Sequence, residues 1–187
     1  MPQTYSFSEP ERFVAGTVGE PGQRTFFLQA RDGQRLATVL LEKEQVQALA
    51  ERMDELLDQV VRRTGGSAPV PALPPDEVDD TDPLDQPIDS EFRVGTMTLS
   101  WDNDEGRVVV EAYATGEEDE PLQEDEPPPD RDVLVVSMTG TAARAFAKRA
   151  HALVAAGRPS CPLCALPLDP EGHVCPRQNG YMRRQEE

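Results

Sequence analysis

Two segments rich in proline and acidic residues limit what this chain can fold into. Residues 64–91 contain six prolines, and residues 116–131 contain eight Asp or Glu side chains. Proline cannot donate a backbone hydrogen bond, and a run of like charges opposes burial, so neither segment is suited to a helix or a central strand. We expect both to be extended, solvated linkers. When residues 157–187 are also set aside, about 110 residues are left for one packed core.

The chain before residue 64 predicts three strands and one helix. β-branched, aromatic and aliphatic residues gather at 13–18, 25–30 and 36–41. Pro-Gly and Asp-Gly dipeptides separate these runs, which indicates a meander of antiparallel strands. From residue 43 to 63 the apolar residues recur every three or four positions. This spacing predicts an amphipathic helix that packs on the meander.

The chain after residue 91 repeats this order. Its strand-forming residues lie at 92–101, 107–114 and 133–138, and an apolar stripe from 143 to 154 predicts a second amphipathic helix. The acidic segment 116–131 therefore enlarges one hairpin turn. Residues 102–106 (DNDEG) have the spaced acids that begin a calcium-binding loop, but the later ligands and flanking helices are missing. We interpret them as a plain turn.

The two parts correspond to one another at an offset of 97 residues. Residues 48–52 (ALAER) fall on 145–149 (AFAKR), and Leu56-Leu57 falls on Leu153-Val154. We therefore predict an internal duplication of a β-β-β-α unit. The predicted fold class is α+β, in which the two halves form an antiparallel sheet system, sandwich-like or barrel-like, with a helix from each half covering it.

A chain of 187 residues has room for one domain and a small appendage. We predict that residues 1–156 form an α+β domain. Half 1 covers about 5–63, the linker is 64–91, and half 2 covers about 92–156 with the acidic insert 116–131. Residues 157–187 form a separate small tail.

All three cysteines of the chain lie within fifteen residues of this tail, together with one of its two histidines. Zn²⁺ binds thiolates and neutral imidazole in a tetrahedron, and a two-residue gap lets both sulfurs of one tight turn point at the same ion. We predict that Cys161, Cys164, His173 and Cys175 bind one structural zinc ion. The tail is then zinc-ribbon-like, with a compressed second half.

Two other interpretations of the cluster stay open. Cys-Pro-Leu-Cys is also similar to the active site of glutaredoxin-type redox proteins, in which the first cysteine begins a helix, but the prolines that follow Cys161 disfavour a helix here. A zinc ion with one open position for catalysis is the other interpretation. Because three thiolates around Zn²⁺ leave a formal charge of about −1, we expect Arg158 or Arg177 to balance it.

Motifs at both ends of the chain resemble a known family. Residues 13–19 (FVAGTVG) and 23–30 (QRTFFLQA) form the first motif, and residues 161–164 (CPLC) with 169–180 (DPEGHVCPRQNG) form the second. On these motifs the whole chain resembles an uncharacterised actinobacterial family catalogued as domain of unknown function 3090. The resemblance implies no activity. It implies two candidate partners, a histidine-phosphatase-like protein and a protein similar to lipid kinases, because family members are often encoded beside them.

The charge of the chain limits the kinds of partner that it can bind. The net charge is −17, yet from residue 140 onward seven Arg or Lys stand against four Asp or Glu. Most of the surface should repel nucleic acid and anionic membranes, with the tail as the one exception. No apolar run approaches the roughly 18 residues of a membrane helix, and the first residues (MPQT) do not begin a signal peptide. We expect a cytosolic protein, since cysteines gathered in a metal-type cluster fit a reducing compartment.

No catalytic signature stands out in the sequence. It contains no G-x-S-x-G elbow and no glycine-rich phosphate loop. His151, the histidine outside the cluster, lies beside the apolar stripe of a predicted helix, where a boundary residue is expected. The first hypothesis is therefore a non-enzymatic interaction or adaptor module that binds a protein partner. The alternatives are a hydrolase or phosphate-handling enzyme with a site between the two halves, and nucleic-acid binding through the basic zinc-bearing tail.

Overall fold

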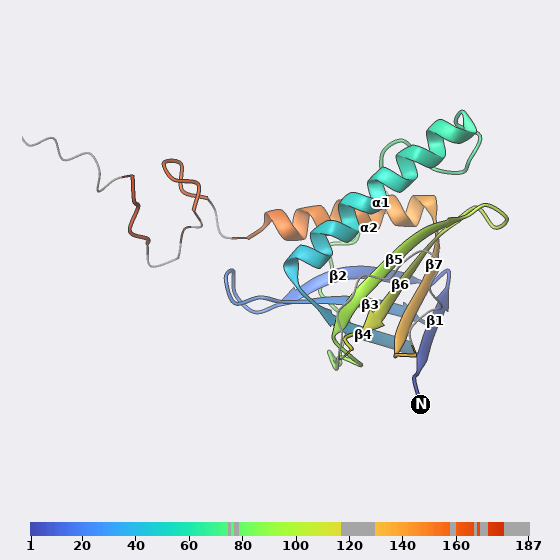
Figure 1. Ribbon diagram of the computed structural model, residues 1–187, viewed down its shortest axis with the longest axis horizontal. Helices are drawn as coiled ribbons and strands as arrows, with labels where there is room; N and C mark the ends of the chain where they lie inside the picture. The colour runs from blue at the N-terminus through green and yellow to red at the C-terminus, as the bar shows by residue number, and fades with distance from the viewer. Residues whose placement is uncertain are drawn as a thin grey trace, which may run out of the picture.

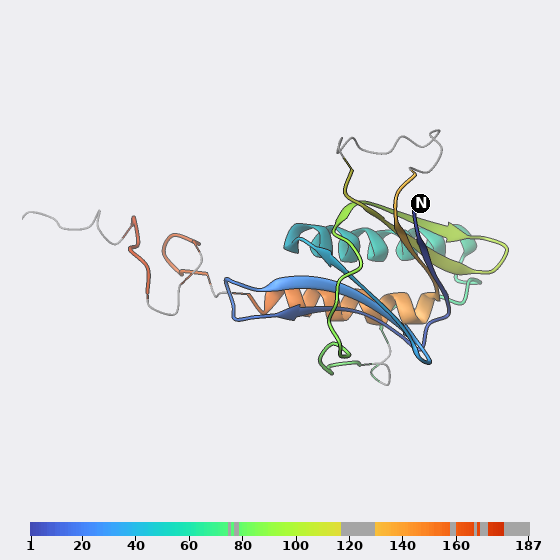
Figure 2. The same cartoon turned by 90° about the horizontal axis from the view of Figure 1, so that it is seen from below.

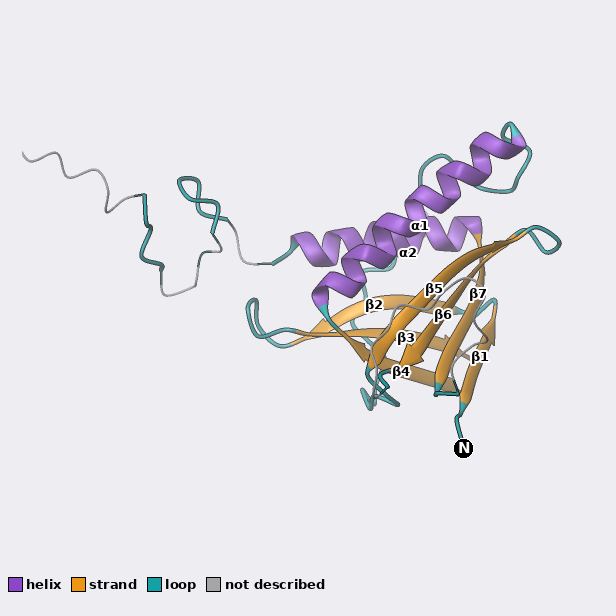
Figure 3. Cartoon of the chain, in the orientation of Figure 1, coloured by secondary structure: helices purple, strands orange, loops and turns teal. Residues whose placement is uncertain are grey.

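Two helices and seven strands make up the part of the chain that the structure describes (Figure 1, Figure 3). The computed structural model describes residues 1–74, 76, 79–116, 130–157, 160–166, 168 and 172–177. In chain order the elements are β1 (Thr4–Ser8), β2 (Arg12–Val18), β3 (Thr25–Asp32), β4 (Arg35–Leu41), α1 (Lys43–Thr64), β5 (Val94–Asp102), β6 (Arg107–Ala114), β7 (Val133–Thr139) and α2 (Gly140–Ala155). All six predicted strands and both predicted helices are confirmed, and β1 is additional.

The strands form two sheets that do not close into a barrel. One sheet is the antiparallel meander β2-β3-β4, and the other has the order β1-β7-β6-β5. Strands β5, β6 and β7 are antiparallel, but β1 pairs with β7 in parallel, with Thr4 opposite Val133. The prediction of a wholly antiparallel system and its barrel-like version are therefore wrong. Strand β1 escaped the sequence analysis because it has five residues, of which only Phe7 is buried.

Both helices lie side by side and cover the sheets, as two perpendicular views show (Figure 1, Figure 2). Helix α2 packs against β2 and β7, while α1 packs against β5. The Thr139 hydroxyl begins α2 by accepting a hydrogen bond from the Ala142 N–H (3.2 Å), which satisfies one free donor of the first turn. Helix α1 ends at Gly65, whose φ of 59° lies in the left-handed region that glycine enters without steric cost.

One continuous hydrophobic core joins both halves. It contains Leu28 and Val39 from the first sheet, Val110 and Val136 from the second, and Met53 from α1. Each of these side chains is at most 1% exposed. The two predicted halves therefore bury their apolar faces against one another.

Buried positions in the two helices agree with the predicted offset of 97 residues. Val46, Leu49 and Met53 of α1 are buried, and so are Ala143, Phe146 and Ala150 of α2. Each half also runs in the order of three antiparallel strands and a helix. This agreement is what a duplication requires, and the shared descent of the halves stays a prediction.

The linker 64–91 is docked on the first sheet over part of its length, so its prediction as a solvated segment is wrong there. After Thr64, the last residue of α1, its described residues form no α-helix and no β-strand. Leu84 is only 6% exposed and packs with Val14 and Phe27 in a second apolar cluster. The buried side chain of Gln29 accepts a hydrogen bond from the Asp85 N–H (2.7 Å) and donates one to the Asp85 carbonyl (3.0 Å). Leu84 and the pairing of the Asp85 backbone with Gln29 thus help to hold an otherwise acidic segment, together with ion pairs such as that between Arg12 and Asp80.

Residues 117–129, most of the predicted acidic insert, lie outside the described residues. Its prediction as a solvated loop is therefore not tested. Among the helices that the structure describes, neither combines the length and apolarity needed to cross a bilayer.

Candidate metal centre

A tight turn brings Cys161 and Cys164 together. The Cys161 N–H donates to the Leu166 carbonyl (2.8 Å), and the Ala165 N–H donates to the Cys161 carbonyl (2.9 Å). Ala165 has a φ of 59°, so the chain reverses directly after the second cysteine. The Leu163 N–H lies 3.4 Å from Cys161 Sγ and donates to it. The turn therefore brings both sulfurs together, and one backbone N–H donates to the first of them.

His173 and Cys175 return to face this turn. Cys175 Sγ lies 3.9 Å from Cys161 Sγ, and His173 Nε2 lies 3.3 Å from Cys164 Sγ. All four ligand atoms are within 4.8 Å of one another. With Zn–S bonds of about 2.3 Å and Zn–N bonds of about 2.0 Å, neighbouring ligands of a tetrahedral ion are roughly 3.5–3.8 Å apart. The four predicted residues are thus brought together, and their donor set fits one zinc ion.

The environment of the two turn cysteines differs. The N–H groups of Cys164 and Leu163 donate to Cys161 Sγ and lower the pKa of that thiol, because they stabilise the thiolate. Burial raises the pKa of the Cys164 thiol. A thiolate is the form that binds metal. The turn therefore favours the metal-binding form of Cys161. A cation bound at the centre would be needed to favour the thiolate of Cys164.

The described residues around the cluster form no apolar core. In the described part of residues 160–177, the only buried side chains are Cys161 and Cys175. Leu163, Leu166 and Val174 are instead 51%, 49% and 80% exposed. A segment that buries only its cysteines lacks the apolar burial that stabilises a small fold.

The other interpretations of the cluster gain less support. All three cysteines are free, and the described residues 160–166 form a turn rather than the helix of a glutaredoxin-type site. Arg158, one of the predicted charge partners, lies outside the described residues. Arg177 is exposed, so the charge balance it was predicted to provide stays a prediction.

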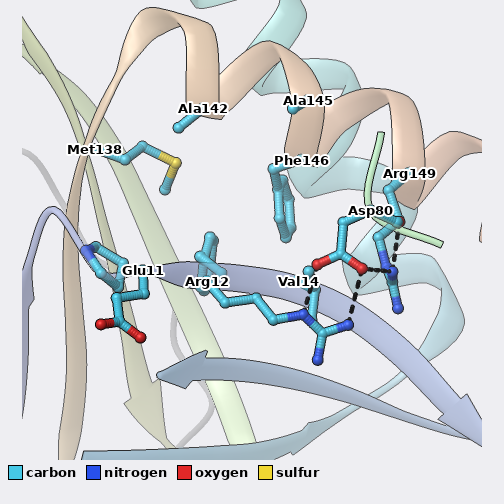
Figure 4. A pocket seen from close by; sticks show the side chains of 11 residues that line it. Glu11, Arg12, Val14, Asp80, Met138, Ala142, Ala145, Phe146 and Arg149 are labelled. Carbon is cyan, nitrogen blue, oxygen red and sulfur yellow. Dashed lines mark hydrogen bonds and ion pairs between the residues drawn. The ribbon is translucent and has the colours of Figure 1, made fainter. Parts of the chain in front are cut away.

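A second group of charged residues lies between the two halves of the body (Figure 4). It borders a cavity of about 110 Å³ between β2 and α2. The Asp80 carboxylate accepts two hydrogen bonds from Arg12, at 2.5 and 2.9 Å, and one from Arg149 at 2.9 Å. The bonds from Arg12 lower the pKa of Asp80, while burial lowers the pKa of Arg149. The linker thus places a carboxylate between two arginines of different elements.

This group is what the sequence analysis missed. Arg12, Asp80 and Arg149 are far apart in the chain, and Asp80 is one of many acids in the linker. Two converging arginines are a feature that a phosphate-handling site would need. Here Asp80 already occupies them, and the cavity is smaller than the roughly 300 Å³ at which ligand pockets begin.

His151 takes part in a network of polar contacts between the helices. Its Nε2 lies 3.0 Å from an oxygen of Asp54 on α1. The other Asp54 oxygen accepts a hydrogen bond from Arg144 (2.7 Å), whose side chain is buried. The structure therefore confirms His151 as a residue at the boundary of the core, paired across the helix interface.

The turn predicted at residues 102–106 joins β5 to β6 as a hairpin. One Asp102 carboxylate oxygen accepts hydrogen bonds from the N–H groups of Asp104 (2.8 Å) and Glu105 (3.0 Å). This bonding is that of a plain turn in which Asp caps its own loop. It confirms the interpretation made from the sequence.

These features define a mixed α+β protein with a Cys₃His cluster after its second helix. A family model described as "Protein of unknown function (DUF3090)" matches residues 5–175, a range that includes the body and all four cluster residues. The chain belongs to this family, as its terminal motifs predicted. No curated protein and no solved structure matches the chain.

Proposed function

We propose that this protein is a cytosolic zinc-binding interaction module without enzymatic activity, whose zinc-ribbon-like tail is held by a structural zinc ion. The observation that carries the proposal is the approach of four ligand atoms, three sulfurs and one imidazole nitrogen, to within 4.8 Å of one another. Protein atoms fill all four positions of a tetrahedral ion, which leaves none for a catalytic water. The ion would contribute folding free energy to a segment that has no core.

The exposed side chains of the tail support an interaction role. Leu163, Leu166 and Val174 are neighbours of the cluster residues in the chain and are about half exposed or more. Exposed apolar side chains that together form one patch mark a protein-binding surface. We propose that this surface docks a protein partner, with the histidine-phosphatase-like and kinase-like proteins as the first candidates.

Metal analysis and partner binding test the proposal together. The purified chain should contain one zinc ion, Cys164→Ser should lose it, and the neighbouring control Ser160→Ala should keep it. A partner should bind the control, and bind weakly or not at all to Cys164→Ser and to the zinc-retaining double variant Leu163→Ser/Val174→Ser. A chain purified without zinc, or a Cys164→Ser protein with full zinc content, would refute the metal centre. A partner bound equally by the double variant would refute the docking surface.

A phosphate-handling role is the second candidate, because Arg12 and Arg149 converge on one point between the halves. It requires Asp80 to leave the two arginines. Calorimetry with inorganic phosphate distinguishes the interaction module from a phosphate-handling enzyme. If the chain is an interaction module, we expect no phosphate binding to the wild type. Binding that is lost in Arg149→Met and strengthened in Asp80→Asn would favour the enzyme.

Nucleic-acid binding through the tail is the remaining alternative. The net charge of −17 opposes it, since phosphate contacts need local positive charge. When labelled single- and double-stranded DNA are titrated at low salt, we expect no salt-sensitive binding to the chain. A strong salt dependence that disappears on truncation at residue 157 would favour this alternative.

A further inference from the structure

A groove of about 790 Å³ runs between α1 and β5, and it shares no residue with the metal cluster. One wall is the face of α1 from Glu44 to Gln59, and the other is β5 from Gly95 to Leu99. A smaller hollow continues it past Leu56 as far as Trp101. Figure 1 shows the helix and the strand side by side along this length. The volume is that of a ligand site, roughly 300–1,000 Å³.

The strand that lines this groove is the edge of its sheet. Among the described strands, β5 pairs with β6 alone. Strand β4 meets the approach to β5 at one bridge, between Leu40 and Arg93. Residues 95–99 of this strand line the groove, and no described strand pairs with their outer backbone groups. An edge of this kind is a template for another strand.

The hydrogen bonds of Gln45 show which way this edge points. Gln45 Nε2 of α1 donates to the carbonyl oxygens of Val94 and Gly95, at 3.1 Å each. Side chain and backbone therefore meet across the start of the groove. From Gly95 to Leu99, β5 and the facing side chains of α1 together line the groove described above.

The floor of the groove is apolar with a period of two. Met97, Leu99 and Trp101 alternate along β5, so they share one face of the strand. All three are partly buried and pack against the main core, as does Leu56 from α1. A strand added at this edge would continue the same apolar layer if its own apolar side chains came at every second position.

We propose that this groove binds an extended segment of a partner protein by strand addition, with apolar side chains at alternate positions and basic residues at its ends. A row of backbone donors and acceptors is satisfied by an extended polypeptide and not by a helix, whose backbone groups are already paired. The chain has a net charge of −17, and the α1 wall carries Glu44 and Glu55 against Arg52. Lys or Arg at the ends of the segment would complement that field.

A single strand suits the groove better than a second copy of the chain. Helix α1 forms one wall, so the space beside β5 is bounded on that side. A second sheet joined edge to edge would bring its own α1 against this helix. The inference goes beyond the proposed function, because it uses no residue of the metal cluster or of the exposed tail.

The experiment selects a displayed library of random decapeptides on the full chain. The enriched peptides should carry apolar residues at every second position and Lys or Arg at the ends. One of them, made synthetically and labelled, should bind in fluorescence anisotropy, and N-methylation of alternate amides should weaken it at least about tenfold because the backbone pairing is lost. A failure to enrich, enrichment at helical spacing, or no effect of N-methylation would overturn the proposal.

Variants of the chain place the binding in the groove. Leu56→Glu should weaken the peptide by about tenfold, since it puts a charge on the apolar floor. Val18→Glu, at a position that is 46% exposed on β2, is the control and should bind like the wild type. If circular dichroism shows that Leu56→Glu does not fold, Glu55→Lys on the exposed rim should weaken binding of the basic peptide in low salt.

Two outcomes would overturn the proposal. One is unchanged peptide binding in the folded variant, and the other is self-association of the chain that Leu56→Glu abolishes. Equal binding by Cys164→Ser is expected and separates this result from the metal centre.

Discussion

Leu84 lies directly over Gly16, so close that a Cβ added to the glycine would be 2.5 Å from Leu84 Cγ. No two non-bonded carbon atoms tolerate that distance, so Leu84 of the linker fits against the strand only because residue 16 is a glycine. The contact lies on the face of the first sheet that points away from the main core. It explains how a segment of acids and prolines is held on a folded body.

Gly16→Ala should therefore destabilise the chain. The new methyl group must push Leu84 aside, at a cost of about 1–3 kcal/mol in the free energy of unfolding. Leu84→Ala should cost about 2 kcal/mol by itself, and the double variant should cost less than the sum, because the smaller side chain makes room for the methyl group. Urea unfolding measures all three. Leu73→Ala, at an exposed linker position, is the control, and strictly additive costs would show that the two residues do not compete for space.

Asp80 should make stability depend on pH below about pH 4. Its pKa is lowered from 3.8 in the folded chain, chiefly by the hydrogen bonds from Arg12. A carboxylate with a depressed pKa stabilises the fold above its unfolded pKa, and this stabilisation is lost as the pH falls toward the folded pKa. Asp80→Asn should be less stable than the wild type by about 2 kcal/mol at pH 7, and the gap should close as the pH falls below 4.

The measurement is urea unfolding from pH 7 to pH 2, with chelator present so that metal release does not contribute. Asp104→Asn, in the exposed β5-β6 turn, is the control. A gap between wild type and Asp80→Asn that stays constant to pH 2 would contradict the assignment.

The predictable part of the fold was the part set by local pattern. Helix α1 has one apolar stripe, from Val46 to Val60, so its position follows from periodicity. The strands of the first meander are runs of β-forming residues separated by turn dipeptides, so their positions follow from local composition. Strand β1 has no such local signal, and its partner β7 lies 129 residues further along. The docking of Leu84 was also hidden, since it depends on the absence of a side chain at Gly16 in another segment.

The same distinction applies to the sites. The four cluster residues were found because ligand spacing is local and its chemistry narrow. The pairing of Asp80 with Arg12 and Arg149, and the groove beside β5, arise only when distant segments are packed together. No pattern in the sequence separates Asp80 from the other linker acids.

Removal of the metal should affect the tail and leave the body intact. The described tail residues bury only Cys161 and Cys175, so without an ion few contacts hold them. Chelation should increase hydrogen exchange of backbone amides from residue 160 to 177, and should leave exchange in β6 and β7 unchanged. Adding zinc back should restore protection. Equal protection of the tail with and without metal would show that the ion is not what orders it.

Arg144 and Asp54 should be energetically coupled across the helix interface. The Arg144 side chain is 6% exposed and donates to Asp54 (2.7 Å) and Asp58 (2.5 Å) of α1. Arg144→Met keeps the apolar stem but removes bonds to charged groups, which should lower the free energy of unfolding by about 2 kcal/mol. Arg52→Met, on the exposed face of α1, is the control and should change it by less than about 0.5 kcal/mol. A double-mutant cycle with Asp54→Asn should give a coupling of about 1 kcal/mol that largely survives in high salt, because a buried arginine is poorly screened. If the two substitutions changed the free energy of unfolding additively, the apolar contacts of the interface, and not this pair, would hold the helices together.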